Sequence, residues 1–269
     1  MIDLNYIIKQ YPLELQKVEF YDQMVKEYLH HLMLQDLFTS GYADNLFFLG
    51  GTAMRFFHGL KRFSEDLDFD CRNITRGDFI DLTNKTLSHL QSYGIDVYCE
   101  DKPRYKNLSA FRRVFVFPEL KYKLGLSQHK EARFFIKIEA EPHNLSYIKD
   151  VKILNGFGVT VPVNVVPVDL ILSTKIAAAL TRKKDRDFYD ILHLKTLAKP
   201  DYTYLAQKQG IETPEDLTSN LLKAAETKRL DQRSMFDCDH MLFFKNDKQK
   251  IRNFVLTLKN FGFSTEAKG

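Results

Sequence analysis

The sequence has no tryptophan and only three cysteines, Cys71, Cys99 and Cys238, none of them in a CxxC pair. An odd number of scattered cysteines predicts neither a disulfide framework nor a zinc knuckle. No apolar run reaches the roughly 18 residues of a membrane helix. The segment 1–5 lacks the basic stretch and apolar block of a signal peptide. We therefore expect a cytoplasmic protein that does not enter a membrane.

Several catalytic signatures are also missing. There is no GxxxxGK[ST], which excludes a P-loop NTPase, and no GxSxG, the mark of a serine hydrolase. The eight histidines form no HExxH. The 39 basic residues exceed the 35 acidic ones by four, which permits a nucleic-acid partner without arguing for one.

The 269 residues allow one large or two modest domains. Apolar periodicity predicts, in chain order, helix 3–38, strand 46–49, a helix from residue 52, strand 66–70, helix 76–94, strands 114–117 and 134–139, an extended segment 159–168, and helices from 169 onward. Pro162 and Pro167 place the extended segment at a sheet edge. The predicted organisation is a helical segment 1–45, an α/β core 46–168 and a helical domain 169–269.

Gly50-Gly51-Thr52 lies between a predicted strand and a predicted helix. Glycines adopt positive φ and let a ligand approach the backbone, and a helix N-terminus attracts phosphate. We expect Gly51→Val to weaken nucleotide binding, because a β-branched side chain does not fit at positive φ. The alternative is a plain turn in which Thr52 caps the helix.

Asp66, Asp68 and Asp70 alternate with Leu67 and Phe69. On a strand, the aspartates share one face, roughly 6–7 Å apart, and two such carboxylates can hold Mg²⁺. The alternative is a solvated edge strand. Because aspartate is depleted in strands, three aspartates in five residues make the functional interpretation as strong as the alternative.

Glu139 lies on the same face of its predicted strand as Lys137 and Glu141. A carboxylate beside the aspartate pair could complete a three-carboxylate metal site. The residues themselves favour the alternative, an ordinary amphipathic strand with a polar outer face.

Lys175 and Asp187 lie on two predicted helices of the C-terminal half. Lys175 is either a phosphate contact or a lysine that reaches solvent past an apolar stripe. Asp187 is either a site residue or half of the i,i+4 pair Lys183–Asp187 on a solvated face, beside a second pair, Arg186–Asp190. If both are catalytic, alanine at either position abolishes activity and leaves thermal melting nearly unchanged.

Three segments together resemble the AbiEii family of nucleotidyltransferase-like toxins of type IV toxin–antitoxin and abortive-infection systems. They are 48–55 (FLGGTAMR), 59–69 (GLKRFSEDLDF) and, further on, 175–180 (KIAAAL) followed by Arg182 and 186–190 (RDFYD). The resemblance covers about 48–190. It implies an α+β fold, a DNA-polymerase-β-like mixed sheet with helices, followed by a helical domain.

The resemblance also implies roles for residues. Gly50, Gly51, Thr52 and Ser64 would bind the nucleotide, and Asp66 and Asp68 would bind Mg²⁺ or Mn²⁺. Lys175 would contact the nucleotide, Asp187 would join it as a catalytic residue, and Glu139 is a further candidate ligand of the metal.

The predicted activity is transfer of a nucleoside monophosphate from an NTP to a tRNA 3′ end, another RNA or a protein hydroxyl, which blocks growth or translation. The expected partner is an antitoxin encoded nearby, which need not bind the toxin directly. The basic stretches 61–62 and 182–184 are compatible with RNA. The alternative is a nucleotidyltransferase fold that binds nucleotide or RNA without turnover.

Overall fold

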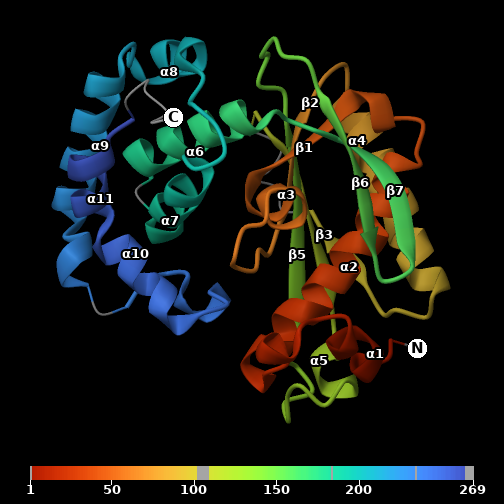
Figure 1. Cartoon of the computed structure of the whole chain (residues 1–269). Coiled ribbons are helices and arrows are strands. Elements are labelled where there is room, and N and C mark those ends of the chain that lie inside the picture. The colour runs from red at the N-terminus through yellow and green to blue at the C-terminus, as the bar shows by residue number, and fades with distance from the viewer. Residues whose placement is uncertain (1, 102–108, 183, 234, 264–269) are drawn as a thin grey trace. The chain divides into compact units, whose positions relative to one another are not determined.

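The computed structural model describes residues 2–101, 109–182, 184–233 and 235–263. The chain divides into two compact units, the first formed by Met1–Gly59 and Phe63–Val166, the second by Leu60–Arg62 and Pro167–Gly269 (Figure 1). The predicted N-terminal segment 1–45 is part of the first unit. No helix within the described ranges is long and apolar enough to cross a membrane.

The first unit is built on one mixed sheet in the order β3-β4-β5-β2-β1-β7-β6. Its strands are β1 Leu46–Leu49, β2 Leu67–Cys71, β3 Tyr98–Glu100, β4 Phe111–Phe117, β5 Phe134–Glu141, β6 Asp150–Gly156 and β7 Val159–Val165. Strand β2 is antiparallel to β1 and parallel to β5, so the aspartate-rich strand lies inside the sheet. The solvated-edge alternative for this strand is therefore wrong.

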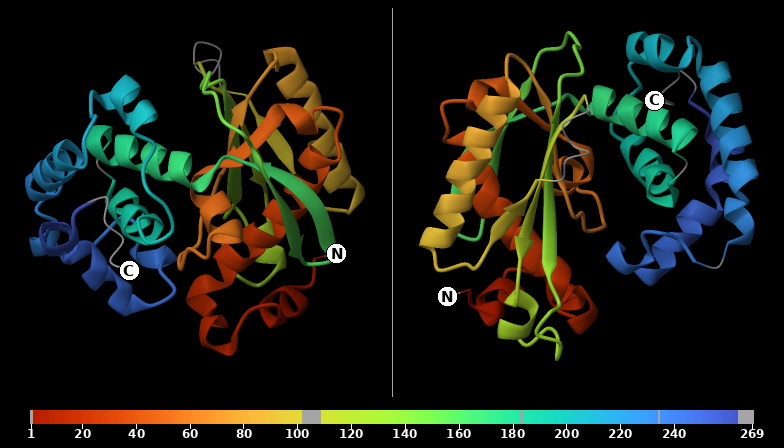
Figure 2. Two further views of the ribbon diagram at one scale, coloured as in Figure 1. Left: turned by 45° about the horizontal axis from the view of Figure 1, so that its top comes forward. Right: turned by 180° about the vertical axis from the view of Figure 1, so that it is seen from behind.

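Alternation along β1 and β2 separates an apolar face from a polar one. Phe48 and Phe69 stack 5.2 Å apart, and Phe38 from the helix α2 (Tyr21–Phe38) lies 6.1 Å from Phe69. Helix α2 packs against β7 and against α4 (Arg76–Ser92), which in turn packs on β4 (Figure 2). These helices cover the apolar face, and the aspartates of β2 project from the other.

Two predictions for this unit need correction. The segment 3–38 is not one helix: α1 (Leu4–Lys9) and α2 are separated by two 3₁₀ turns, the first of which begins directly after Pro12. Strand β7 is not at the edge, because β6 lies outside it. Pro162 pairs with Ile153 of β6, whereas β1 reaches β7 only at Val165, so no ladder bond to β1 is needed at the proline.

Short helices complete the first unit: α3 Gly50–Phe57 follows β1, and α5 Leu120–Lys123 follows β4. The described part of the second unit is helical. It contains α6 Val168–Thr181, α7 Asp185–Leu194, α8 Tyr202–Gln209, α9 Pro214–Lys228, α10 Lys248–Arg252 and α11 Phe254–Phe261. Phe188 and Phe254 meet edge to face in its core, 5.0 Å apart. The segment Leu60–Arg62 joins this unit through the backbone bond from Phe243 N–H to the carbonyl of Lys61.

Candidate functional site

The glycine turn connects β1 directly to α3. Gly50 has φ 81°, and a Cβ at this position would lie 2.7 Å from Oδ2 of Asp68. Only glycine tolerates that backbone conformation at little cost, and only glycine leaves room for the Asp68 carboxylate. Positive φ therefore belongs to Gly50, whereas Gly51 is the second, buried residue of α3. The expectation of positive φ at Gly51 is wrong.

Thr52 is buried and fixes the turn to the neighbouring strand. Its hydroxyl donates to the main-chain carbonyl of Asp66 at 2.5 Å. The N-cap of α3 is Leu49, which rules out the alternative in which Thr52 caps the helix. Ser64, the other predicted nucleotide-binding residue of this segment, is also buried. The N-terminus of α3 is thus held beside the start of the aspartate strand.

The structure brings the three predicted carboxylates to adjoining positions of two neighbouring strands. Asp66 immediately precedes β2 and Asp68 lies on it, and their side chains are 37% and 34% exposed. In the parallel register, Glu139 of β5 is the direct partner of Asp68. Three acidic groups in so small an area repel one another unless a cation compensates them.

In this structure, Lys137 supplies a compensating positive charge to all three carboxylates. Its ammonium lies 3.5 Å from Asp66, 3.8 Å from Asp68 and 3.5 Å from Glu139. Burial by itself would lower the pKa of Lys137, but the charges of Asp68, Asp66 and Glu139 outweigh it and raise that pKa. Lys137 therefore stays charged at neutral pH. Its backbone N–H also donates to Asp66, at 3.3 Å.

Glu139 has a second cationic partner, because Arg112 on β4 forms an ion pair with it. Within the described ranges, no group of three or more histidine, cysteine or acidic side chains has a geometry that holds a metal ion. Metal binding by Glu139 thus stays a prediction. The donor chemistry of Asp66 and Asp68 does fit Mg²⁺ or Mn²⁺, since hard carboxylate oxygens already converge on a cation there.

The third aspartate of the strand has a different environment. Asp70 is buried and accepts hydrogen bonds from the backbone N–H of His143 at 3.0 Å and from the hydroxyl of Tyr147 at 2.5 Å. Burial would raise the pKa of Asp70, but the bonds from His143 and Tyr147 lower it. The Asp70 carboxylate therefore has a structural role: its hydrogen bonds hold the segment after β5 against strand β2.

Lys175 and Asp187 belong to the second unit, where both are buried. The Lys175 ammonium lies 2.8 Å from Asp190 and 3.7 Å from Asp187. The guanidinium of Arg62 donates twice to the same Asp190, at 2.8 and 2.7 Å. Burial would raise the pKa of Asp190, but Arg62 and Lys175 lower it to about 2.

Asp187 is also held by Arg182, which donates to both of its carboxylate oxygens at 2.9 and 2.8 Å. The alternatives that placed Lys175 and Asp187 on solvated helix faces are therefore wrong. Asp190 pairs with Arg62 and Lys175, not with Arg186 as the i,i+4 spacing predicted. Lys183, the other member of the predicted pair with Asp187, lies outside the described residues.

Four participants were missed by the sequence analysis. Lys137 and Arg112 join the carboxylates through the alignment of β4, β5 and β2, which no local pattern reveals. Asp190 had a usable signal, because it lies three residues after Asp187 on one helix. Arg62 had none, since its partner is 128 residues away.

A mixed sheet followed by a helical unit, with a glycine turn entering a helix beside paired strand carboxylates, defines the fold as the α+β fold of nucleotidyltransferases. The family model described as "Nucleotidyl transferase AbiEii toxin, Type IV TA system" matches residues 31–255. The chain belongs to this AbiEii family of nucleotidyl transferase toxins. No curated protein matches it in sequence.

Solved structures are similar in fold at low sequence identity. MenT4, a nucleotidyltransferase toxin from Mycobacterium tuberculosis, has a TM-score of 0.53 and 16% identity over 97% of this chain and 91% of its own. JHP933 from Helicobacter pylori has a TM-score of 0.48 and 18% identity, covering 88% and 95% of the two chains. A putative nucleotidyltransferase from H. pylori has a TM-score of 0.48 and 19% identity, covering 87% and 96%.

Proposed function

We propose that this chain transfers a nucleoside monophosphate from an NTP to a hydroxyl of an RNA, with a tRNA 3′ end as the first acceptor to test. The observation that carries the proposal is the packing of Gly50 against Asp68. It sets the N-terminus of α3, whose free N–H groups suit a phosphate, next to two carboxylates that suit a divalent cation. An enzyme that catalyses nucleotidyl transfer has to bind both a triphosphate and a metal ion.

Asp66 and Asp68 would hold Mg²⁺ or Mn²⁺, with Glu139 as a further ligand. The metal supplies neutralisation of the charge that develops on the transferred phosphate. The chain itself contributes the α3 N-terminus, and the bond from Thr52 to the Asp66 carbonyl keeps that N-terminus and the first aspartate together. Ser64 is proposed as a further contact of the nucleotide.

Lys175 is proposed as a countercharge for the triphosphate. Its support is geometric: the Lys175 side chain is buried, and Asp190 and Asp187 orient its ammonium group, which suits an anionic ligand. Asp187 then acts as a positioning residue for Lys175. The biological consequence would be arrest of growth or translation in the cytoplasm, where NTPs and tRNA occur. The expected antitoxin, encoded nearby, need not form a complex with this chain.

The experiment is incubation of the purified chain with each α-³²P-labelled NTP in turn, Mg²⁺ and total tRNA, resolved on denaturing RNA and protein gels. We expect label on RNA with one or a few of the nucleotides. Label on protein alone would move the acceptor to a protein hydroxyl. No label on either would favour the fold that binds without turnover.

Asp66→Asn and Asp68→Asn should each abolish transfer, because each removes a charged oxygen from the cation site. The matched control is Asp150→Asn on β6, which removes an exposed carboxylate paired with Lys152 in the same unit. The control should transfer at the wild-type rate. Wild-type turnover in either of the first two variants would refute the metal assignment.

A further inference from the structure

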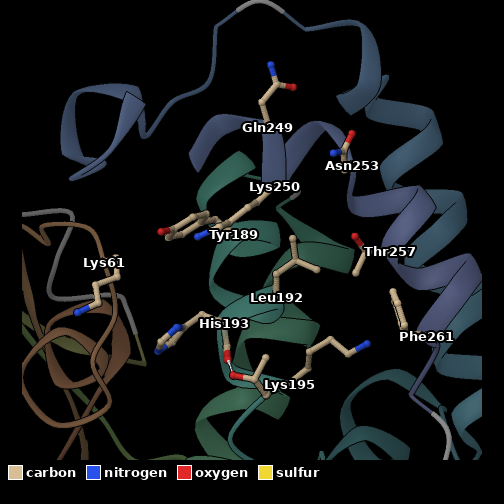
Figure 3. A pocket seen from close by; sticks show the side chains of 11 residues that line it. Lys61, Tyr189, Leu192, His193, Lys195, Gln249, Lys250, Asn253, Thr257 and Phe261 are labelled. Carbon is tan, nitrogen blue, oxygen red and sulfur yellow. Dashed lines mark hydrogen bonds between the residues drawn. The ribbon is translucent and has the colours of Figure 1, made fainter. Parts of the chain in front are cut away.

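The second unit contains a surface pocket of about 610 Å³, to which the nucleotide site described above assigns no role. It is formed by α7, the turn after it, α10 and α11, together with Lys61 (Figure 3). Its lining residues are Lys61, Tyr189, Leu192, His193, Lys195, Thr196, Gln249, Lys250, Asn253, Thr257 and Phe261. A pocket of several hundred Å³ is large enough to take in a nucleotide.

One part of the pocket wall is apolar and includes an exposed aromatic ring. Leu192 of α7 faces Thr257 and Phe261 of α11 in Figure 3. Phe261 is 71% exposed, so the face of its ring is accessible in the described part of the chain. An exposed ring beside an apolar wall is a stacking platform for a planar base.

The charged groups of the pocket are all cations. Lys61, Lys195 and Lys250 line it, and none of its lining residues is Asp or Glu. Lys195 donates to the carbonyl of Gly262 at 2.6 Å, so its charge is not neutralised by that contact. Asp247, which does not line the pocket, accepts a hydrogen bond from Tyr189 and forms an ion pair with Lys250, so Lys61 and Lys195 supply the positive charge of the lining. Such a lining favours an anionic ligand.

Two primary amides, Gln249 and Asn253, are exposed on the helical side of the pocket. Amide side chains hydrogen-bond the edges of nucleobases, which present both donors and acceptors. The pocket thus offers a complement to each part of one unpaired nucleotide. The aromatic ring suits the face of the base, the amides suit its polar edge, and the lysines suit the phosphate.

We infer that this pocket binds a single-stranded nucleotide of the acceptor RNA. The inference rests on the proposed function in one respect, that the acceptor is an RNA. It gives the second unit a role in RNA binding. The residues involved differ from Lys175 and Asp187, which are proposed to act on the NTP.

The first test measures affinity without NTP or metal, by fluorescence anisotropy of a labelled 12-nucleotide single-stranded RNA of mixed sequence. Phe261→Ala should weaken binding about tenfold or more, because it removes a stacking contact. Leu256→Ala is the matched control, since Leu256 is a 58% exposed apolar residue of the same helix that does not line the pocket. It should bind within twofold of wild type.

The second test measures the salt dependence of the same binding. Lys61→Met should reduce the slope of log K against log[salt] by about 0.7, the value for one phosphate contact on a single strand. Lys259→Met is the control: Lys259 is a lysine of α11 paired with Glu226 and is not in the pocket. Its slope should equal that of wild type.

A third test locates the bound RNA. A single-stranded RNA that contains 4-thiouridine should crosslink to the chain within residues 249–261.

The outcomes separate this inference from the proposed function. Asp68→Asn should lose transfer and keep wild-type RNA affinity. If the wild type transfers to RNA while Phe261→Ala binds as tightly as wild type, the pocket assignment is wrong and the proposed function stands. If wild type binds no RNA, the inference is overturned.

Discussion

Lys137 lies among the three carboxylates that are proposed to hold the metal, so its removal is the sharpest perturbation of the site. Its ammonium interacts with three carboxylates at 3.5, 3.8 and 3.5 Å. A pair of unit charges 4 Å apart is worth about 1 kcal/mol in water and about 4 kcal/mol at an effective dielectric constant of 20. The four side chains are 20–37% exposed, so screening favours the lower figure.

At about 1 kcal/mol per pair, the three contacts oppose binding of another cation by about 3 kcal/mol. A divalent ion must displace the ammonium before it can take the same oxygens. We therefore predict that Lys137→Met raises the affinity for Mn²⁺ by roughly 100-fold, at about 1.4 kcal/mol per tenfold. Titration of free Mn²⁺ by electron paramagnetic resonance measures this affinity directly, without nucleotide or turnover.

The control is Lys152→Met, which removes one lysine from β6 and changes net charge equally. It should leave Mn²⁺ affinity unchanged. A second readout follows from repulsion: without Mn²⁺, Lys137→Met should melt below the wild type, and Mn²⁺ should restore more of its Tm than it adds to the wild type. Unchanged or weaker Mn²⁺ binding in Lys137→Met would show that the ammonium and the metal do not share a site.

Two further predictions concern the first unit. Gly50→Ala should abolish nucleotide transfer while the chain still folds, because the added Cβ meets the Asp68 carboxylate and the φ of 81° strains any other residue; circular dichroism and the labelling assay measure the two effects. Burial lowers the pKa of His30 to about 3, so the unfolded chain takes up this proton near pH 6.5 and the folded chain does not. Stability should therefore fall as pH drops from 6.5 toward 3, by about 1.4 kcal/mol per pH unit from this group, and His30→Gln should show a shallower slope in denaturant titrations.

Each of these has an outcome that contradicts it. Full transfer by Gly50→Ala would mean that the turn is structural only. Equal pH slopes in wild type and His30→Gln would mean that His30 is protonated in the folded chain. His31, whose pKa burial lowers to about 4, keeps part of the wild-type slope in the variant, so the comparison is one of magnitude.

The sequence predicts the parts of the site that are local. The path from β1 through the glycines into α3 follows from a short apolar run, a turn signal and helical periodicity, all within residues 46–57. The alternation of the aspartate strand also predicts correctly that Leu67 and Phe69 are buried on the opposite face. These features depend on backbone preferences and on side-chain alternation, which operate over a few residues.

The parts that the sequence did not predict depend on register between distant strands. That Lys137 lies among the carboxylates follows from the parallel alignment of β5 with β2, which sets Asp68 against Glu139. A shift of one residue would turn Lys137 to the opposite face. The burial of Lys175 is another such case, since a lysine in an apolar helix is compatible with a solvated or a buried end until its partners are known.

Burial of Lys175 also decides how its proposed role in NTP binding has to be tested. Alanine at Lys175 or Asp187 would break a buried ion pair at a cost of about 3–5 kcal/mol. We therefore predict lower rather than unchanged melting temperatures, and loss of activity alone would not indicate chemistry. Arg62 provides the comparison, because Arg62→Met and Lys175→Met each remove one cation from the same Asp190. We predict that both variants melt earlier, and that only Lys175→Met weakens NTP binding in a titration below both melting temperatures. Equal NTP affinities in the two variants would show that Lys175 has only a structural role in the second unit. Binding of the triphosphate would then be proposed for the glycine turn alone.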